Sequence, residues 1–279
     1  MKGMVFADAW EFSALCIEAQ SCLWQQDTPY QKIWVLETQG WGKVLVLDDV
    51  LQLTERDNFI YHEMMVHPAL FIHPAPKRVA IAGGGDCGVL TEVLKHAEVE
   101  EALLIELDEE VTKVCQRFFP ELTACLADPR ASCLFGDAIA FMEQSVSGRL
   151  DAILVDSTDP IGQAARLFGK DFYRACFEAL ASPGVLAVQS ESPLFHLDLL
   201  KSIRKNMREA GFPDVATLSF PQPTYPSGWF SVTLAAKGIS LRSLRQGALE
   251  KKTFPTRYYC REIHDASFAL PAFAAEALI

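Results

Sequence analysis

Residues 83–88, with the sequence GGGDCG, form a glycine-rich segment between an apolar run and a stretch of helical character. The pattern GxGxxG in this setting lets a ligand approach the backbone and leads into a helix N-terminus. Glu106 ends the next apolar run, 18 residues after Gly88. A carboxylate at this place can accept hydrogen bonds from both hydroxyls of a ribose. Together these residues predict a nucleoside site. A tight strand-to-helix turn is the alternative for the glycines alone.

Asp137 follows the third apolar run, in the sequence Gly136-Asp137-Ala138. An acid at this place can accept a hydrogen bond from an adenine amino group. Capping of the following helix is the simpler role for an isolated Asp. Acids after the second and third strands together are typical of the methyltransferase-like Rossmann fold, so we expect Asp137 and Ala138 to contact the nucleoside.

Asp86 lies inside the glycine-rich segment, where the amino-acid tail of S-adenosylmethionine would lie. A carboxylate at this place repels the carboxylate of that tail and attracts a tail that ends in an amine. Asp86 therefore indicates a decarboxylated donor. Capping of the following helix is again the alternative.

Asp156 and Asp159 end the fourth apolar run in the sequence DSTDP. The carboxyl ends of parallel strands form the edge at which open α/β sheets bind ligands. Two carboxylates so close together are costly unless a cation or hydrogen bonds compensate them. The pair therefore indicates a cationic ligand, unless one of the two acids caps a turn before Pro160.

Alternating strands and helices are expected to carry these residues. The sequence predicts strands at 79–82, 102–107, 131–135, 150–155 and 184–189, helices at 89–96, 109–118, 137–145 and 171–180, and an antiparallel edge hairpin from 215–220 and 229–236. This order indicates a mostly parallel sheet with helices on both faces. A preceding helix is expected at 55–72, with Phe59, Ile60 and Met64 on its apolar side and with an end or a kink at Pro68.

The first part of the chain has the pattern of a small antiparallel β unit. Residues 32–38 alternate, QGWGK at 39–43 predicts a hairpin turn, and strands follow at 43–48 and 51–54. Residues 10–26 are expected to supply two more strands. We therefore predict an N-terminal β domain at 1–54 and a Rossmann-like α/β catalytic domain at 55–279.

Composition excludes several classes of protein. Half of the 279 residues are apolar and 22% are charged, which excludes a disordered chain. The net charge of −11 argues against a nucleic-acid partner and suits a cationic small molecule. We expect no membrane span, no signal peptide, a cytoplasmic location, free buried thiols at the eight scattered cysteines and no metal site. His62, Glu63 and His67 do not form the HExxH pattern, because the histidines are five residues apart.

Many further motifs resemble the polyamine aminopropyltransferase family, which includes the spermidine synthases. They are spread over most of the chain: Tyr30-Gln31, QLTERD at 52–57, Tyr61-His62-Glu63, GGGDCG at 83–88, EVLKH at 92–96, DPR at 128–130, DSTDP at 156–160, Gln189, PTYPSG at 223–228 and Tyr258-Tyr259.

The resemblance implies a reaction and a role for each matching residue. The donor would be decarboxylated S-adenosylmethionine, the acceptor putrescine, and the products spermidine and methylthioadenosine, with no prosthetic group. The implied nucleoside-binding residues are Gln31, Gly83, Glu106, Asp137 and Ala138. Asp86 would hold the aminopropyl amine, and Asp156 would accept the proton of the attacking amine. The residues that would line the diamine channel are Tyr61, His62, Asp159, Gln189 and Tyr225. A homodimer or homotetramer with the β unit at the contact is also implied.

Three positions depart from the family pattern. Cys87 replaces a glycine, Asp49 follows Asp48 where the family has Asp-Gly, and Gln163 replaces a proline in the loop that closes over the substrates. Asp49 would be strained if the turn needs a positive φ. Three alternatives stay open: transfer to cadaverine, agmatine or spermidine, an ordinary methyltransferase, and a non-catalytic sensor of polyamines or nucleosides.

Overall fold

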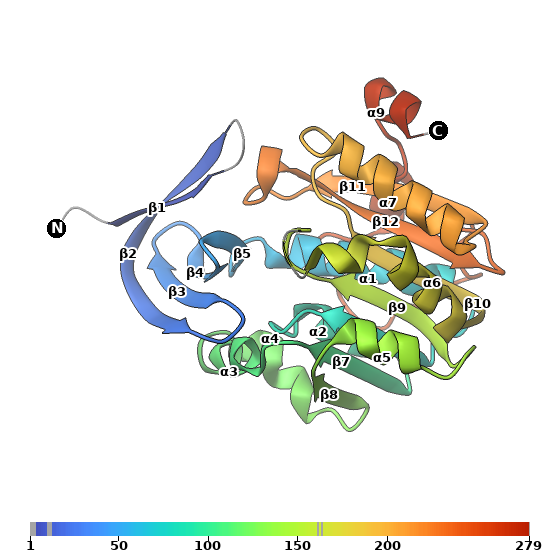
Figure 1. The fold of residues 1–279 in the computed structure, drawn as a ribbon, viewed down its shortest axis with the longest axis horizontal. Helices are drawn as coiled ribbons and strands as arrows, with labels where there is room; N and C mark the ends of the chain where they lie inside the picture. Colours follow the sequence, from blue (N-terminus) through green and yellow to red (C-terminus); the bar gives the residue numbers. More distant parts are fainter. Residues whose placement is uncertain (1–3, 10–12, 161, 163, 279) are drawn as a thin grey trace.

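The computed structural model describes residues 4–9, 13–160, 162 and 164–278. Within these residues the strands form two sheets, one of five strands and one of seven. Figure 1 shows the N-terminal sheet on one side of the larger sheet, with helix α1 (Asn58–Ile72) running from one to the other. The predicted α/β class with a small antiparallel β part is confirmed, and the boundary between residues 54 and 55 stays a prediction.

The N-terminal sheet is antiparallel throughout and follows chain order. Its strands are β1 (Met4–Ala9), β2 (Ala14–Asp27), β3 (Lys32–Thr38), β4 (Gly42–Leu47) and β5 (Val50–Thr54). Alternation in β3 buries Ile33 and Val35 on one side, where they meet helix α3 (Glu109–Phe118) in a shared core. The prediction of two strands within residues 10–26 is wrong, because β2 occupies most of that stretch alone and β1 precedes it; Trp10 lies outside the described residues.

The seven-stranded sheet has the order β11-β12-β10-β9-β6-β7-β8. Its strands are β6 (Arg78–Gly83), β7 (Glu101–Glu106), β8 (Ala131–Phe135), β9 (Leu150–Asp156), β10 (Leu180–Gln189), β11 (Asp214–Pro221) and β12 (Trp229–Lys237). Strands β8, β7, β6, β9 and β10 are parallel, and β12 and β11 add an antiparallel hairpin at the edge. The predicted mostly parallel sheet and its edge hairpin are confirmed.

Helices cover both faces of this sheet, as predicted. One face packs on α1 and α2 (Gly88–Leu94), and the other on α5 (Ala138–Gln144), α6 (Lys170–Ala179) and α7 (Leu197–Ala210). The remaining helices are α4 (Pro120–Thr123), α8 (Arg261–Ser267) and α9 (Ala272–Ala277), with short 3-10 helices η1 (Ala124–Ala127), η2 (Ala164–Phe168) and η3 (Pro226–Gly228). Helix α7 was missed by the sequence analysis although Leu200, Ile203 and Met207 bury at helical spacing.

Helix α1 differs from its expected form in two ways. It continues through Pro68 to Ile72, so the expected end at the proline is wrong, while a kink there stays a prediction. Every residue from Tyr61 to Ile72 is buried, which replaces the expected single apolar side. A helix enclosed on all sides must satisfy its polar side chains internally. This requirement explains why the polar residues of α1 reach partners in other segments.

The sheet order reverses between β6 and β9, and the carboxyl ends of both strands meet there. In register, Gly83 at the end of β6 lies beside Asp156 at the end of β9. This edge faces the N-terminal sheet: Gln31 donates to Asp108 after β7, and Tyr225 donates to the backbone oxygen of Gln52 in β5. Open α/β sheets bind ligands at such a reversal, and here a second sheet covers it.

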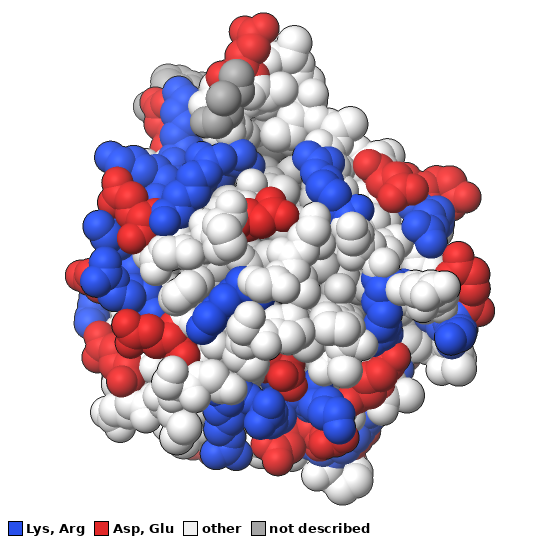
Figure 2. Space-filling model, turned by 90° about the vertical axis from the view of Figure 1, so that its right-hand side faces the viewer, with Lys and Arg blue, Asp and Glu red and all other residues white. Residues whose placement is uncertain are grey.

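The surface agrees with the charge argument on one side of the molecule. On the face turned away from the N-terminal sheet, Lys and Arg side chains lie among Asp and Glu side chains rather than in one continuous basic surface (Figure 2). In the described part of the chain, no helix is long and apolar enough to span a membrane.

The eight cysteines all lie within the described residues and are free thiols. Cys87, Cys115 and Cys176 are buried, but Cys16, Cys22 and Cys260 are exposed. The prediction that the thiols are buried is therefore wrong for the last three. Two of these lie in β2, whose outer face is open to solvent.

The turn between β4 and β5 contains a strained residue. Asp48 and Asp49 have φ values of 48° and 67°, and the side chain of Asp48 accepts a hydrogen bond from the Lys32 amide at 2.9 Å. We expect Asp49→Gly to raise the free energy of unfolding by about 0.5–1 kcal/mol, because glycine adopts positive φ without steric cost. Asp48→Gly is the matched control and should stabilise less, since it also removes the bond to Lys32. Urea unfolding measures the free energy of unfolding of both variants. An Asp49→Gly variant that is no more stable than wild type, or no more stable than Asp48→Gly, would refute the strain at Asp49.

Candidate active site

The glycines at the end of β6 are required by the end of β9. Gly83 has a φ of 84°, and a Cβ atom there would overlap the backbone oxygen of Asp156. A Cβ atom on Gly84 would lie 2.7 Å from Oδ2 of the same aspartate. Only residues without a side chain let the two strand ends approach so closely. The glycine-rich loop and Asp156 therefore form one wall.

Asp86 is paired with His62 of α1. Its Oδ1 accepts from the Gly88 amide at 2.7 Å, which caps the start of α2, and its Oδ2 lies 3.4 Å from Nε2 of His62. Burial by itself would raise the pKa of Asp86, but the charge and hydrogen bond of His62 outweigh it and lower that pKa. Burial would likewise lower the pKa of His62, and Asp86 reverses this to a raised pKa. The two groups favour a carboxylate–imidazolium pair.

His62 contacts the glycine-rich loop as well as Asp86, and its role beside the diamine stays a prediction. The sequence analysis assigns His62 to the diamine, whereas its ring lies against the glycine-rich loop, where a Cβ atom on Gly88 would overlap it. The helix that carries His62 also carries Tyr61, one residue earlier and turned to Asp156. Neighbouring residues of a helix point about 100° apart. The two residues can therefore contact two different groups, Asp156 and Asp86.

Asp156 receives a hydrogen bond from Tyr61, whose hydroxyl lies 2.6 Å from Oδ1. Burial, and then the charge of Asp86, raise the pKa of Asp156 to about 6. Burial and the charge of Asp156 raise the pKa of Tyr61 well above its ordinary value, so its phenol stays a donor. Asp156 can thus exchange a proton near neutral pH while Tyr61 holds its orientation.

Tyr225 reaches this group of residues from the loop between β11 and β12. Its ring meets that of Tyr61 edge to face at 5.6 Å, and its hydroxyl donates to the Gln52 backbone oxygen. Burial, followed by the charge of Asp156, raises the pKa of Tyr225 well above its ordinary value. The structure thus brings Tyr61, Asp86, Asp156 and Tyr225 together from four separate parts of the sequence.

Glu106 and Gln31 lie at the other end of the glycine-rich loop. Oε1 of Glu106 accepts from the Asp108 amide at 2.9 Å, and a Cβ atom on Gly85 would lie 2.9 Å from Oε2. Burial raises the pKa of Glu106 to about 7. Gln31 donates to Oδ2 of Asp108 at 3.1 Å, so Asp108, which the sequence analysis missed, links the N-terminal sheet to the end of β7.

Asp137 takes the simpler of its two expected roles in this structure. Its Oδ1 accepts from the Ile139 amide at 2.8 Å and caps α5. Ala138 is buried in the first turn of that helix. A cap uses one carboxylate oxygen, so contact with an adenine amino group stays a prediction for this pair.

A second acidic group lies beyond Asp156, at the end of β10. Gln189 donates to Oε1 of Glu191 at 3.2 Å and to the backbone oxygen of Ser157 at 3.3 Å. Burial, and then the charge of Asp159 and its hydrogen bond to Glu191, raise the pKa of Glu191 well above its ordinary value. Glu191 therefore holds a proton more readily than an ordinary glutamate, and a cation near Asp159 would offset the repulsion between the two groups.

Glu191 was missed by the sequence analysis. It is 2% exposed and has a φ of 61°, a combination that is strained and costly for a charged residue. Its position two residues after Gln189, at the carboxyl end of a central strand, was the available signal. Gln163, by contrast, lies outside the described residues, so its expected effect on the loop after Asp156 is not described.

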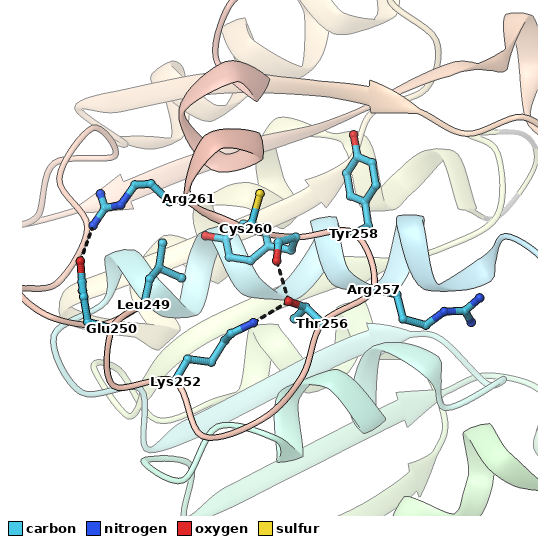
Figure 3. A pocket seen from close by; sticks show the side chains of 9 residues that line it. Leu249, Glu250, Lys252, Thr256, Arg257, Tyr258, Cys260 and Arg261 are labelled. Carbon is cyan, nitrogen blue, oxygen red and sulfur yellow. Dashed lines mark hydrogen bonds and ion pairs between the residues drawn. The ribbon is translucent and has the colours of Figure 1, made fainter.

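Two other parts of the structure, a surface hollow and a histidine cluster, have some features of a site. A hollow of about 500 Å³ lies among residues 249–261, where Lys252 donates to Thr256 and Arg261 lies 3.3 Å from Glu250 (Figure 3). Lys252 and Arg261 already have partners there, so we place the chemistry at Asp86 and Asp156 instead. His67 contacts His96 at 3.0 Å and Glu92 at 3.1 Å, but among the described residues no group of three ligands fits a metal ion.

The raised pKa of buried Glu106 predicts that the free energy of unfolding depends on pH. Its pKa of about 7 exceeds the unfolded value of about 4.3, so its contribution is present below the unfolded pKa and is lost as pH rises through about 7. We expect wild-type protein to lose about 2 kcal/mol more than Glu106→Gln in urea unfolding between pH 5.5 and pH 8. Parallel pH dependences for both proteins would refute the raised pKa. Exposed Glu276→Gln serves as the control.

The chain is similar to known proteins over most of its length. Residues 58–243 match the family model described as "Spermine/spermidine synthase domain", and residues 7–55 match "Spermidine synthase tetramerisation domain". Curated relatives named polyamine aminopropyltransferase include those of Methylococcus capsulatus, 51% identical over 95% of this chain and 93% of the relative, and Xanthomonas axonopodis pv. citri, 49% identical over 95% and 94%.

Solved structures show the same likeness. A spermidine synthase in complex with the transition state analogue AdoDATO superposes with a TM-score of 0.96, at 33% identity over 100% of this chain and 96% of that one. The spermidine synthase of Thermotoga maritima gives 0.94, also at 33% identity, over 100% and 95%. Both fold and sequence therefore agree with the resemblance found from the motifs.

Proposed function

The chain belongs to the spermine/spermidine synthase family and is an aminopropyltransferase, and from this premise we propose its donor, acceptor and catalytic groups. The donor is decarboxylated S-adenosylmethionine, the acceptor is putrescine, and the products are spermidine and methylthioadenosine. One observation carries the proposal: the Tyr61–Asp156 hydrogen bond has further carboxylates near it, namely half-buried Asp86 beside His62, and half-buried Asp159 beside buried Glu191. A cationic tail and a dicationic acceptor need this distribution of charge.

Asp86 supports the choice of donor. Its carboxylate lies in the glycine-rich loop and keeps a lowered pKa through His62, so it is ionised when the donor arrives. An ionised carboxylate attracts the terminal ammonium of the decarboxylated donor and repels the carboxylate of intact S-adenosylmethionine. This contrast makes methyl transfer from the intact donor the less favoured alternative. Gln31, Gly83, Glu106, Asp137 and Ala138 would hold the nucleoside.

Asp156 is proposed to accept the proton of the attacking amine. The nitrogen lone pair forms a bond to the propyl carbon next to sulfur, the carbon–sulfur bond breaks, and sulfur keeps that electron pair as a neutral thioether. The amine nitrogen loses one proton to Asp156, whose pKa of about 6 suits a base at neutral pH. Because a sulfonium is already a good leaving group, no acid is needed on the departing side.

The Asp159–Glu191 pair supports a diamine acceptor. A buried glutamate whose pKa is raised by a neighbouring carboxylate is stabilised by an ammonium that binds beside both, because the cation offsets the like-charge repulsion. Gln189 holds Glu191 in position at 3.2 Å. The second ammonium of putrescine would bind here while the first faces Asp156. Cadaverine, agmatine and spermidine carry the same charges at other spacings and are the alternative acceptors.

We also propose a homo-oligomer, either a homodimer or a homotetramer, built through the N-terminal sheet. The match of residues 7–55 to a tetramerisation domain supports this. A cytoplasmic location fits an enzyme of polyamine synthesis and is kept as part of the proposal.

Removal of the base tests the mechanism. We expect Asp156→Asn to lower kcat by about 100-fold or more, since general-base assistance is worth about 10²–10⁴-fold. Binding of methylthioadenosine, measured by calorimetry, should survive. Asp198→Asn, a surface change in an exposed pair with Lys201, is the control. A kcat within about threefold of wild type would exclude Asp156 as the base.

Asp86 can be tested through two nucleosides that differ in one amine. Asp86→Asn should weaken the decarboxylated donor by about 10–100-fold, the range for a hydrogen bond between charged groups. Methylthioadenosine lacks the amine, so its affinity should change by less than about threefold. Equal losses for both ligands would mean that Asp86 supports the loop and does not recognise the tail.

Competition between acceptors tests the substrate. Purified enzyme with the decarboxylated donor and equimolar putrescine, cadaverine, agmatine and spermidine should yield spermidine first, as read by mass spectrometry. A different product would keep the reaction and change the acceptor. Methylation from intact S-adenosylmethionine, with no transfer from the decarboxylated donor, would contradict the proposal.

A further inference from the structure

Asp57, the last residue of the QLTERD segment, is a buried carboxylate to which neither the sequence analysis nor the proposed reaction gives a role. It lies where the N-terminal sheet leads into α1 and is 3% exposed. Its Oδ1 accepts from the hydroxyl of Thr54 at 2.6 Å. Its Oδ2 accepts from the hydroxyl of Thr224 at 2.7 Å and from the Thr224 amide at 3.3 Å. One carboxylate thus joins two segments that are 167 residues apart in sequence.

The ordinary role of an aspartate at this place is absent. Asp57 occupies the N-cap position of α1, yet its side chain makes no capping hydrogen bond in the described structure. Its backbone oxygen accepts from the Ile60 amide, which starts the helix without the carboxylate. A buried carboxylate is costly to keep in an apolar setting. Helix capping therefore does not account for Asp57.

The two segments held by Asp57 each carry a tyrosine of the acceptor side. Tyr225 follows Thr224 directly, and Tyr61 lies one helical turn after Asp57 on α1. Their rings meet at 5.6 Å, and each also meets Phe230, at 4.8 Å from Tyr225 and 5.9 Å from Tyr61. Tyr61 in turn donates to Asp156. A movement of Thr224 away from Asp57 would separate the two rings in front of the base.

We propose that Asp57 is a positioning residue that sets the width of the acceptor channel by holding the loop of Tyr225 against the helix of Tyr61. The inference rests on the proposed function, because it assumes that the amine acceptor passes between these tyrosines. It assigns to Asp57 an effect on acceptor binding, with donor binding left intact, since no contact of Asp57 reaches the glycine-rich loop among the described residues.

A carboxylate is required at this place because all three of its partners are donors. The hydroxyl of Thr54 and both groups of Thr224 point hydrogens at its two oxygens. The Thr224 amide can only donate, and the Thr54 hydroxyl already accepts from the Arg56 and Asp57 amides, so an NH₂ group turned toward either would face a donor. Asp57→Asn thus breaks the link on one side with almost no change of volume.

The test compares Asp57→Asn with two variants of its partner. Thr224→Val removes the 2.7 Å bond of the hydroxyl, leaves the 3.3 Å bond of the amide and keeps Asp57 in place, so it weakens the link even if Asp57→Asn does not fold. Thr224→Ser keeps the hydroxyl and is the conservative control. Initial rates with decarboxylated S-adenosylmethionine give KM and kcat for putrescine, or for whichever amine the wild-type enzyme uses. Calorimetry with methylthioadenosine gives the affinity of the nucleoside site.

We expect Asp57→Asn and Thr224→Val to raise the acceptor KM by about tenfold, with the Kd of methylthioadenosine within about twofold of wild type and Thr224→Ser close to wild type. Improved relative use of a bulkier amine, such as spermidine over putrescine, is expected from both variants. An unchanged acceptor KM in Thr224→Val, or equal losses at both sites, would overturn the inference. A wild-type enzyme that transfers to no amine would instead refute the proposed function.

Discussion

Repulsion between carboxylates gathered at one edge of the sheet is the constraint on which the rest of the structure depends. Asp86 and Asp156 lie close enough for the charge of one to raise the pKa of the other, and Asp159 does the same to Glu191. Each is kept by a specific partner: His62 for Asp86, Tyr61 for Asp156 and Gln189 for Glu191. The site is thus built for cations, and their binding would relieve the strain that the protein carries alone.

The glycines and helix α1 follow from that constraint. Carboxylates can be gathered only where strand ends approach closely, and Gly83 and Gly84 permit this by having no Cβ atom to meet Asp156. Helix α1 supplies two of the partners from consecutive residues, Tyr61 and His62. It can do so because it is enclosed on all sides from Tyr61 onward, which leaves its polar groups no water to satisfy them.

The N-terminal part of the chain is joined to the same edge by several hydrogen bonds. Thr28 and Gln31 donate to Asp108, Gln52 accepts from Tyr225, and Thr54 donates to Asp57 at the start of α1. These contacts reach both the end of β7 and the loop of Tyr225. A change in the packing of the small sheet on the larger one would therefore move residues on both sides of Asp156.

The sequence alone determined the class of fold, the strands that carry the site and most of the acidic residues in it. This was possible because apolar periodicity and the glycine pattern are local properties, and the motif order specified the family. It failed at Pro68, which lies inside an enclosed helix, and it gave no role to Glu191, which has a strained φ, or to Asp57, which links two distant segments. Only the tertiary structure decided that His62 faces Asp86, that Asp159 lies beside Glu191, and that Thr224 meets Asp57. Each of these is a distance between residues far apart in the chain, which spacing in sequence does not encode.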